Sequence, residues 1–338
     1  MIKIGLIGVG FMGGTHAACY EALAQSINFK VTAVADLDSN KAEKIAEKFG
    51  ARVYSTGKEL IESGEVNTVD ICLPTFLHTE HAIDAMEKGY NVFIEKPICL
   101  HEYEAQKLLD AQKKTGAKVA VGHCIRFWPE YVHLKKLIDN SCYGKLISGV
   151  FKRISPLPLW GWENWLLDSA RSGSAAVDLH IHDVDYVRYI LGNPDSIQSC
   201  TTTVNGNNDH IFSLYKYGDA VVSIEGGWGY PAAMPFEMEY RVRFEKAVVV
   251  FNSGKTPSLM VYNEDGTAEE PVLEKDFNSE SQGLGGNITS LGGYFNELKY
   301  FIECLENKDE IKIAPLKEGV ESFRLVMKEI NSAMVSSL

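Results

Sequence analysis

A carboxylate and an imidazole at helical spacing form the first group in this sequence that is suited to chemistry. Asp178, His182 and Asp185 occupy positions i, i+4 and i+7, so they are predicted to share one polar stripe of a helix. Histidine titrates near neutral pH and a carboxylate one turn away can orient its ring, which suits proton transfer. For Asp178 and His182 taken alone, a simple pairing across the helix face is the favoured alternative.

The same stretch contains several possible metal ligands, yet we expect no metal site. His180 cannot share the helix face of His182, so three convergent ligands are not evident. A chain of this size can also build its cores without a stabilising metal ion.

A glycine-rich loop near the N-terminus is predicted to bind phosphate groups, because it follows a strand pattern and opens a helix. Gly8 would permit the tight turn, Gly10 would let the backbone approach a pyrophosphate, and Gly13 would let helix and strand pack closely. The helix N-terminus would add N–H groups and a favourable dipole. Alone, the three glycines could also form an ordinary strand-to-helix turn. The expected loop comprises Gly8, Gly10, Phe11, Met12 and Gly13.

Asp36 turns this loop into a predicted dinucleotide site. It ends the next strand pattern, at about the spacing where an acidic residue accepts hydrogen bonds from the ribose hydroxyls. Its charge would repel a 2′-phosphate, and no arginine follows it directly. We therefore expect NAD rather than NADP, although Lys41 could still approach a phosphate.

Polar residues also follow two later strand patterns, over 69–73 and 92–94. Open α/β sheets bind ligands beyond the carboxyl ends of their strands, so these residues are predicted to face the cofactor. Beside a dinucleotide, Lys96 could hydrogen-bond the nicotinamide ribose and a substrate hydroxyl, whose deprotonation its charge favours. The alternative is a solvated Glu–Lys pair at a strand end. The set comprises Pro74, Thr75, His78, Glu95, Lys96 and Pro97.

The first third of the chain alternates short apolar runs with helical patterns, which predicts a parallel, doubly wound α/β sheet of the Rossmann type. Ser39 is expected to cap the first of the three helices below, and glycines to end them. The expected strands are 2–7, 31–35, 69–73, 92–94 and 119–121, and these helices are 39–49, 78–88 and 102–115.

After Gly122, strand-like segments separated by Gly, Asn and Asp turns predict a second, α+β domain with a mostly antiparallel sheet. We expect domains over 1–122 and 123–338, and a mobile loop over 276–293, which is rich in Ser, Gly and Asn. The expected strands are 146–154, 197–204, 211–217, 220–225, 236–244 and 247–251, and the helices are 129–139, 174–191, 294–306 and 316–336.

Composition limits the classes of protein to which the chain can belong. With 338 residues, 45% of them apolar, it is predicted to be a folded protein of two domains. A net charge of −12 opposes the phosphate contacts of nucleic-acid binding. The sequence shows neither a signal-peptide pattern nor an apolar run of about 20 residues, which predicts a cytoplasmic protein without a membrane partner. The seven cysteines, without a CxxC pair, are expected to be free and buried.

Taken in chain order, these motifs resemble the glucose–fructose oxidoreductase / inositol dehydrogenase / MocA (Gfo/Idh/MocA) family over nearly the whole length. The resemblance implies a Rossmann domain followed by an α+β domain whose open-faced, mostly antiparallel sheet often mediates homodimers or homotetramers. It also implies an NAD(P)-dependent dehydrogenase acting on a polyol, inositol or sugar derivative. The motifs that carry it are the glycine loop, Asp36, Glu95-Lys96-Pro97 and Asp178-x-x-x-His182-x-x-Asp185.

The resemblance further implies roles for single residues. Lys96, Asp178 and His182 would form the catalytic group: His182 would exchange the hydroxyl proton while hydride passes to the nicotinamide, and the other two would orient and polarise the substrate oxygen. Arg126 is implied near the cofactor, in the segment with Pro129 that enters the second domain. Trp165 is implied near cofactor and substrate.

The sequence departs from the family pattern at two positions beside the expected pocket, so the substrate cannot be inferred from any one family member. Leu166 follows Trp165 where the family often has arginine, and Gly173-Ser174 stands where it often has two glycines. Two other functions stay open: an NAD-dependent glycosidase that oxidises a sugar carbon transiently, and a non-catalytic dinucleotide-sensing regulator. The retained Lys96, Asp178 and His182 favour the dehydrogenase over the regulator, and stoichiometric NADH release would argue against the glycosidase.

Overall fold

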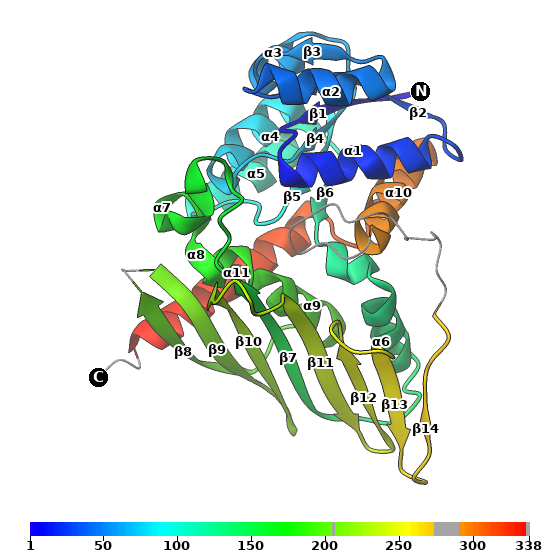
Figure 1. The fold of residues 1–338 in the computed structure, drawn as a ribbon, viewed down its shortest axis with the longest axis vertical. Helices are drawn as coiled ribbons and strands as arrows, with labels where there is room; N and C mark the ends of the chain where they lie inside the picture. The colour runs from blue at the N-terminus through cyan, green and yellow to red at the C-terminus, as the bar shows by residue number, and fades with distance from the viewer. Residues whose placement is uncertain (205–206, 274–290, 336–338) are drawn as a thin grey trace. The chain divides into compact units, whose positions relative to one another are not determined.

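The computed structural model describes residues 1–204, 207–273 and 291–335. The chain forms two compact units, coloured along the chain in Figure 1. The first comprises Met1–Phe127 and Asp276–Glu321, and the second comprises Trp128–Lys275 and Ser322–Leu338. Within the described ranges, no helix combines the length and the apolar character that a membrane span requires.

The first unit is built on a parallel sheet of six strands in the order β3-β2-β1-β4-β5-β6. The order reverses direction between β1 and β4, the position at which such sheets bind ligands. The predicted Rossmann sheet is confirmed, with one additional strand: β3 is short and not fully buried, so it leaves no apolar run in the sequence. The strands are β1 (Ile2–Ile7), β2 (Phe29–Ala35), β3 (Arg52–Tyr54), β4 (Thr68–Ile71), β5 (Asn91–Glu95) and β6 (Val119–Gly122).

Helices cover this sheet, as its nearly continuous apolar strands require. One core cluster joins α1, α2 and α10 to the sheet, while α3 contacts α4 and α4 contacts α5. The predicted range of α2 is confirmed, but Ser39 is not its cap: the Asp38 carboxylate accepts the N–H groups of Asn40 and Lys41. The helices are α1 (Phe11–Leu23), α2 (Ser39–Phe49), α3 (Gly57–Glu62), α4 (His78–Glu87), α5 (Glu102–Thr115) and α10 (Gly292–Glu306), with η1 (Thr75–Leu77) and η2 (Cys124–Phe127) as short 3-10 turns.

The position of α10 makes the units differ from the predicted domains. Its side chains Phe295, Leu298 and Phe301 are buried in the same core cluster as β1 and α1 of the first unit. A segment from the last sixth of the chain therefore completes the first core, which a single division at residue 122 does not anticipate. The predicted loop over 276–293 lies outside the described residues except for its last three, and α10 begins at Gly292.

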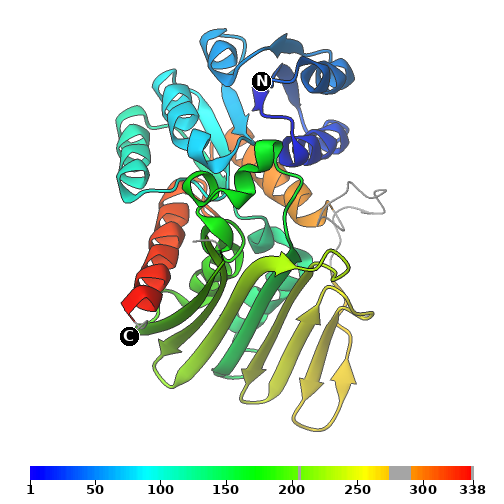
Figure 2. The same ribbon diagram turned by 60° about the vertical axis from the view of Figure 1, so that its left-hand side comes forward.

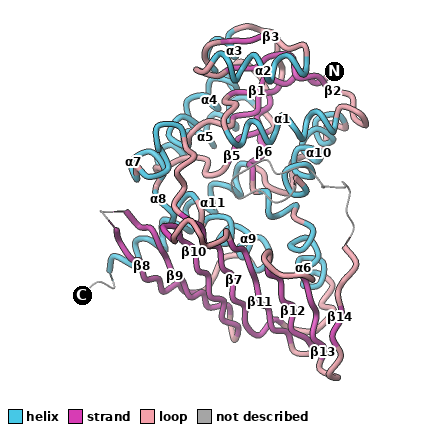
Figure 3. Tube along the Cα trace, in the orientation of Figure 1, coloured by secondary structure: helices cyan, strands magenta, loops and turns pink. Residues whose placement is uncertain are grey.

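The second unit contains an eight-stranded sheet in the order β14-β13-β12-β11-β7-β10-β9-β8. Among the described strands of this sheet, only β7 and β10 pair in parallel, so the predicted, mostly antiparallel sheet is confirmed. Figure 3 shows these strands running side by side. They are β7 (Leu146–Pro156), β8 (Ser196–Val204), β9 (Asn207–Tyr217), β10 (Ala220–Tyr230), β11 (Glu237–Phe244), β12 (Ala247–Asn252), β13 (Leu259–Asn263) and β14 (Ala268–Glu269).

Helices pack on one face of this sheet, and α11 lies along it in Figure 2. The ring of Tyr131 in α6 meets Tyr240 of β11 and Phe251 of β12 edge-on, and Tyr186 in α9 is equally buried. The elements are α6 (Pro129–Asp139), η3 (Trp162–Leu167), α7 (Ser169–Ser172), α8 (Ser174–Asp178), α9 (Ile181–Leu191) and α11 (Leu316–Val335).

The prediction of one helix over 174–191 is wrong. The segment forms α8 and α9, separated by Leu179 and His180. At the break, the N–H of His180 donates to the carbonyl of Ala175, five residues earlier, so the turn is one residue wider than an α-helical turn. Widened turns of this kind are frequent at functional sites.

All seven cysteines are free, as predicted, but they are not all buried. Cys142 and Cys200 are exposed and Cys72 is partly buried.

Candidate active site

The glycine loop has the geometry that its sequence predicts. Gly8 has a φ of 84°, which favours glycine, and a Cβ on Gly13 would collide with the carbonyl of Gly8. Gly13 therefore permits the close contact between α1 and the loop. A Cβ on Gly10, by contrast, would meet no atom within 4 Å among the described residues. The space beside Gly10 fits a group outside the chain, and a pyrophosphate is the group that this loop type holds.

Asp36 lies directly against the loop. Its Oδ2 accepts the N–H of Val9 at 2.7 Å and its Oδ1 accepts the N–H of Asp38 at 2.8 Å. The first turn of α1 contains no acidic side chain, so its N–H groups and dipole can attract an anion. The loop, the helix start and the carboxylate at the end of β2 together fit the diphosphate and ribose of a dinucleotide.

Replacing Asp36 with alanine is expected to lower the NAD-to-NADP ratio of kcat/KM by about 10- to 100-fold. A charge-assisted hydrogen bond is worth about 1.5–3 kcal/mol, and the repulsion of a 2′-phosphate disappears with the carboxylate. Steady-state kinetics with both cofactors measure the ratio. Asp38→Ala is the matched control, because it removes a neighbouring carboxylate that caps α2 and should leave the ratio unchanged. An unchanged ratio in Asp36→Ala would refute the assignment.

The segment after β4 contributes Pro74, Thr75 and His78. Thr75 is buried, and its hydroxyl has no hydrogen-bond partner within the described part of the chain, which fits a ligand there. His78 contacts the backbone with both ring nitrogens, and its predicted contact with the cofactor stays a prediction. Its Nδ1 lies 2.7 Å from the Pro97 carbonyl and its Nε2 lies 2.7 Å from the Leu73 carbonyl. Both ring nitrogens thus face backbone, and His78 connects the segments that follow β4 and β5.

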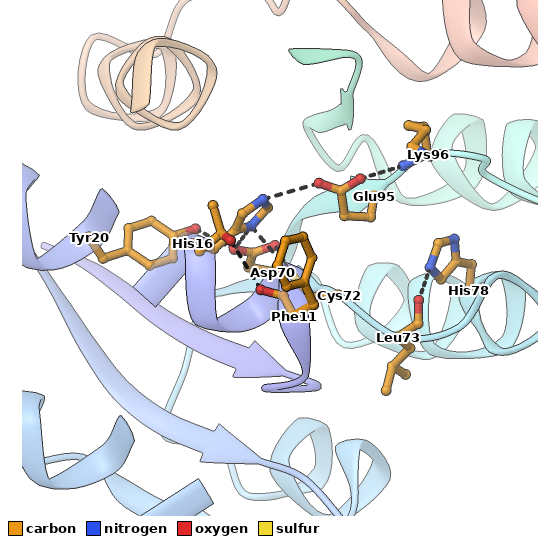
Figure 4. A network of polar contacts seen from close by, with 10 residues as sticks. Phe11, His16, Tyr20, Asp70, Cys72, Leu73, His78, Glu95 and Lys96 are labelled. Carbon is orange, nitrogen blue, oxygen red and sulfur yellow. Dashed lines mark hydrogen bonds and ion pairs between the residues drawn. The ribbon is translucent and has the colours of Figure 1, made fainter. Parts of the chain in front are cut away.

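Glu95 ends β5 and Lys96 follows it directly, and Figure 4 shows both at one side of a buried polar network. Lys96 is partly buried, whereas Glu95 is only 4% exposed. One oxygen of Glu95 accepts the backbone N–H of Lys96 at 3.1 Å, and the other lies 3.1 Å from Nε2 of His16. The alternative of a solvated Glu–Lys pair is therefore wrong for Glu95. The contact of Glu95 with the cofactor stays a prediction.

The network continues beneath the glycine loop. The Asp70 Oδ2 receives two contacts, from Nδ1 of His16 at 2.8 Å and from the Tyr20 hydroxyl at 2.7 Å. Glu297 of α10 is buried beside His16 and Glu95, with all three ligand atoms within 4.8 Å of one another. Burial and the Glu95 charge hold the pKa of Glu297 well above 4.5, which favours its neutral carboxyl form. These groups could also ligate a metal, although the sequence predicted no metal site.

The pKa of His16 is raised well above 6.5. Burial alone would lower it, but the charge and the hydrogen bond of Asp70, with a smaller contribution from Cys72, outweigh that effect. The raised pKa favours the imidazolium form, whose stabilising contribution is complete below pH 6.5 and is lost as pH rises through the folded-state pKa. The raised pKa of Glu297 has the same sign and acts from pH 4.5 upward.

We expect the first unit to lose stability as pH rises above 6.5, and His16→Gln to lose less over the same range. Hydrogen exchange of amides in α1, followed by mass spectrometry after correction for intrinsic exchange rates, measures the opening free energy at each pH. An identical pH dependence in wild type and His16→Gln would contradict the expectation.

In the second unit, Asp178 ends α8 and His182 lies in the first turn of α9. Asp178 is partly buried and His182 is 8% exposed, while Val177, Ile181 and Val184 form the predicted apolar side. The predicted i, i+4 spacing therefore spans the wide turn rather than one regular helix.

The side chains of Asp185 and His180 are buried and contact residues of α11 in this unit. Asp185 was predicted on the same polar stripe, but it is fully buried and accepts the Ser322 hydroxyl at 2.7 Å. His180 turns away from His182, as predicted: its Nε2 lies 3.2 Å from Glu329, which also accepts the Tyr215 hydroxyl at 2.8 Å. A Cβ on Gly226 would overlap the His180 ring, so glycine at that position makes room for it.

The remaining predicted residues lie as follows. Arg126 is buried in the first unit, and its guanidinium is 3.9 Å from Glu318. Trp165 packs on a small apolar cluster of the second unit that includes Leu166 and Trp228. Ser174 has a φ of 61°, so its backbone adopts the left-handed conformation that a glycine, common there in the resembled family, adopts without strain.

His16, Asp70 and Glu297 were not predicted from the sequence. Asp70 could have been recognised from the sequence as a paired carboxylate. It lies inside the strand Thr68–Ile71, and a carboxylate in a buried strand needs a partner. His16 and Glu297 lie on helices whose periodicity is compatible with either a core or a surface position, and their partners are distant in sequence.

Two sequence models of one family match this chain. The model described as "Oxidoreductase family, NAD-binding Rossmann fold" matches residues 2–123. The model described as "GFO/IDH/MocA C-terminal domain" matches residues 131–250.

Individual relatives agree with these matches. An uncharacterized oxidoreductase of Streptococcus pneumoniae serotype 4 is 32% identical over 259 residues, which cover 68% of this chain and 67% of the relative. Inositol 2-dehydrogenase of Rhizobium meliloti is 25% identical over 320 residues, covering 92% and 90% of the two chains. Levoglucosan dehydrogenase, solved in complex with NADH and levoglucosan, has the same fold, with 20% identity, a TM-score of 0.83 and coverage of 99% and 98%.

Proposed function

The chain belongs to the Gfo/Idh/MocA family of NAD-binding oxidoreductases, and on that premise we propose that it oxidises or reduces a hydroxyl carbon of a polyol, inositol or sugar derivative. The main observation that supports binding of the cofactor at this loop is the open space beside Gly10, which lies near the tight turn at Gly8 and the Asp36 carboxylate. Relatives named as an inositol and a levoglucosan dehydrogenase support the substrate class.

The residues proposed for the chemistry are Lys96, Asp178 and His182. Bound NAD supplies the hydride acceptor. His182 would accept the hydroxyl proton as the C–H bond of the substrate transfers its hydride, and would return a proton in the reverse direction. The Lys96 ammonium favours the alkoxide form of the substrate oxygen, and Asp178 would orient the hydroxyl as an acceptor.

The experiment that tests this function is a screen for NAD reduction over inositols, aldoses, sugar acids and amino sugars. Stoichiometric NADH with one or more of these substrates supports the proposal. Cleavage of a glycoside without accumulation of NADH would replace it with a glycosidase. Tight NAD binding without turnover of any substrate class would favour a regulator.

We also propose that the chain forms a homodimer or homotetramer through the face of the eight-stranded sheet opposite its helices. Phe212 is 46% exposed and Leu214 is 49% exposed there, on β9. Two exposed apolar side chains on one strand mark a surface suited to association.

Phe212→Glu combined with Leu214→Glu is expected to shift the protein to monomer, since each charge would have to be buried at the contact. Light scattering after size-exclusion chromatography measures the mass. Tyr103→Glu, at an exposed aromatic residue of the first unit, is the control. A wild-type protein that stays monomeric at high concentration would contradict the proposed oligomer.

A further inference from the structure

The buried network of Figure 4 connects the helix of the cofactor loop to the residue proposed for catalysis. His16 lies on α1, and its ring is completely buried. Its Nδ1 contacts Asp70 of β4 at 2.8 Å, and its Nε2 contacts Glu95 of β5 at 3.1 Å. The second oxygen of Glu95 accepts the N–H of Lys96 at 3.1 Å. His16, Glu95 and Lys96 thus form a continuous path from the cofactor helix to Lys96, and Asp70 holds the other side of the His16 ring.

We propose that His16 is a positioning residue for Lys96, acting through Glu95. This inference rests on the proposed function, since it assumes that Lys96 acts on the substrate. His16 holds the Glu95 carboxylate in one orientation, and Glu95 in turn holds the backbone at Lys96. The Lys96 side chain, with its ammonium group, then extends from a backbone that is held in one position by a buried carboxylate.

The two contacts of His16 favour a proton on each of its ring nitrogens. Both nitrogens face carboxylate oxygens, of Asp70 and of Glu95. A neutral imidazole has one N–H and would direct a lone pair at the other carboxylate, whereas the imidazolium ion favours both contacts. The buried cation also compensates charge that would otherwise be costly in the interior.

Glu95 has little freedom to adopt another position. A Cβ on Gly122 of the neighbouring strand β6 would lie 2.9 Å from its Oε1, so the carboxylate fills the space that this glycine leaves. On the other side of the turn, His78 contacts the Pro97 carbonyl at 2.7 Å. The backbone of Lys96 is therefore held on both sides.

The path also relates the cofactor to Lys96. The first turn of α1 belongs to the glycine loop, and His16 follows on the same helix. A bound dinucleotide that orders the start of α1 thereby orders the ring that contacts Glu95. All of these residues belong to the first unit.

The experiment compares His16→Gln and Glu95→Gln with Tyr20→Phe in the full-length protein. Tyr20→Phe is the matched control, because it removes a buried hydrogen bond to the same Asp70 on the side away from Glu95. We expect kcat to fall about 10- to 100-fold in His16→Gln and Glu95→Gln, because small displacements of a reacting group cost about 100-fold. The Kd for NAD should change less than about threefold, and Tyr20→Phe should keep kcat while losing stability.

A second readout does not depend on turnover. The acetylation rate of the Lys96 side chain, measured by mass spectrometry relative to exposed Lys58, reports how the ammonium group is presented. We expect this ratio to change at least about threefold in His16→Gln and Glu95→Gln and to stay constant in Tyr20→Phe. If no substrate is turned over, this ratio still tests the positioning of Lys96, so failure of the function and failure of the inference are distinguishable.

Three outcomes would overturn the inference. The first is an equal loss of kcat in all three variants that follows their loss of stability. The second is an unchanged labelling ratio in His16→Gln and Glu95→Gln. The third is one equivalent of tightly bound metal in the purified protein that is lost in His16→Gln, since a cation would then occupy the position assigned to the proton.

Discussion

Replacing Lys96 with alanine is expected to lower kcat by about 10²- to 10⁴-fold, the range that a positioned acid–base or polarising group contributes. The Kd for NAD should change little, because the loop and Asp36 are the groups proposed to hold the dinucleotide. His182→Ala should lower kcat by a similar factor, because it removes the group proposed to accept the hydroxyl proton. The double variant should be little worse than either single variant, since residues that act as a unit are not additive.

Steady-state kinetics on the best substrate of the screen, together with NAD binding by fluorescence, measure both quantities. Lys58→Ala and His133→Ala are the controls, because they change an exposed lysine and a half-buried histidine without a proposed role. Activity that survives in both Lys96→Ala and His182→Ala would remove the proposed mechanism while leaving the cofactor site intact.

The second large effect concerns stability. Asp183→Ala is expected to lower the free energy of unfolding of the second unit by about 3–5 kcal/mol, because it leaves a buried arginine without its carboxylate. Arg153 of β7 is 3% exposed, and its Nε and Nη2 lie 2.7 and 3.3 Å from the two oxygens of Asp183 in α9. The pair fastens the helix that carries His182 to the central strands of the sheet.

Urea unfolding followed by tryptophan fluorescence measures this effect selectively. All five tryptophans of the chain lie within the second unit. Asp139→Ala is the matched control, because it removes the carboxylate of an ion pair with Lys135 whose Asp139 side chain is 53% exposed, and should cost at most about 1 kcal/mol. A loss in Asp183→Ala no larger than in the control would show that the buried pair does not stabilise the unit.

Much of the first unit was predictable from the sequence because its signals are local. The strand pattern over 2–7, the helix range 39–49 and the glycine spacing all depend on neighbours within one turn or one strand. The contribution of α10 to the first core was not predictable in this way. Its apolar stripe is visible in the sequence, but nothing local states which sheet that stripe covers.

The second unit shows the same division. The alternating strands were recognisable by their turns, whereas the break between α8 and α9 was not. It follows from the burial of His180 against Gly226 and Glu329, which lie far along the chain. Periodicity alone favours a continuous helix, and tertiary contacts overrode it.

By itself, the sequence was enough to recognise the glycine loop, Asp36 and the side chains proposed for catalysis, because each motif depends on residue type and short spacing. Only the tertiary structure decided what supports them. His16 contacts Asp70, which lies 54 residues later in the chain, and it also contacts Glu95, which lies even further along the sequence. Those contacts form only when parallel strands that are distant in the chain become neighbours in the sheet, and the burial that follows makes the charges pair.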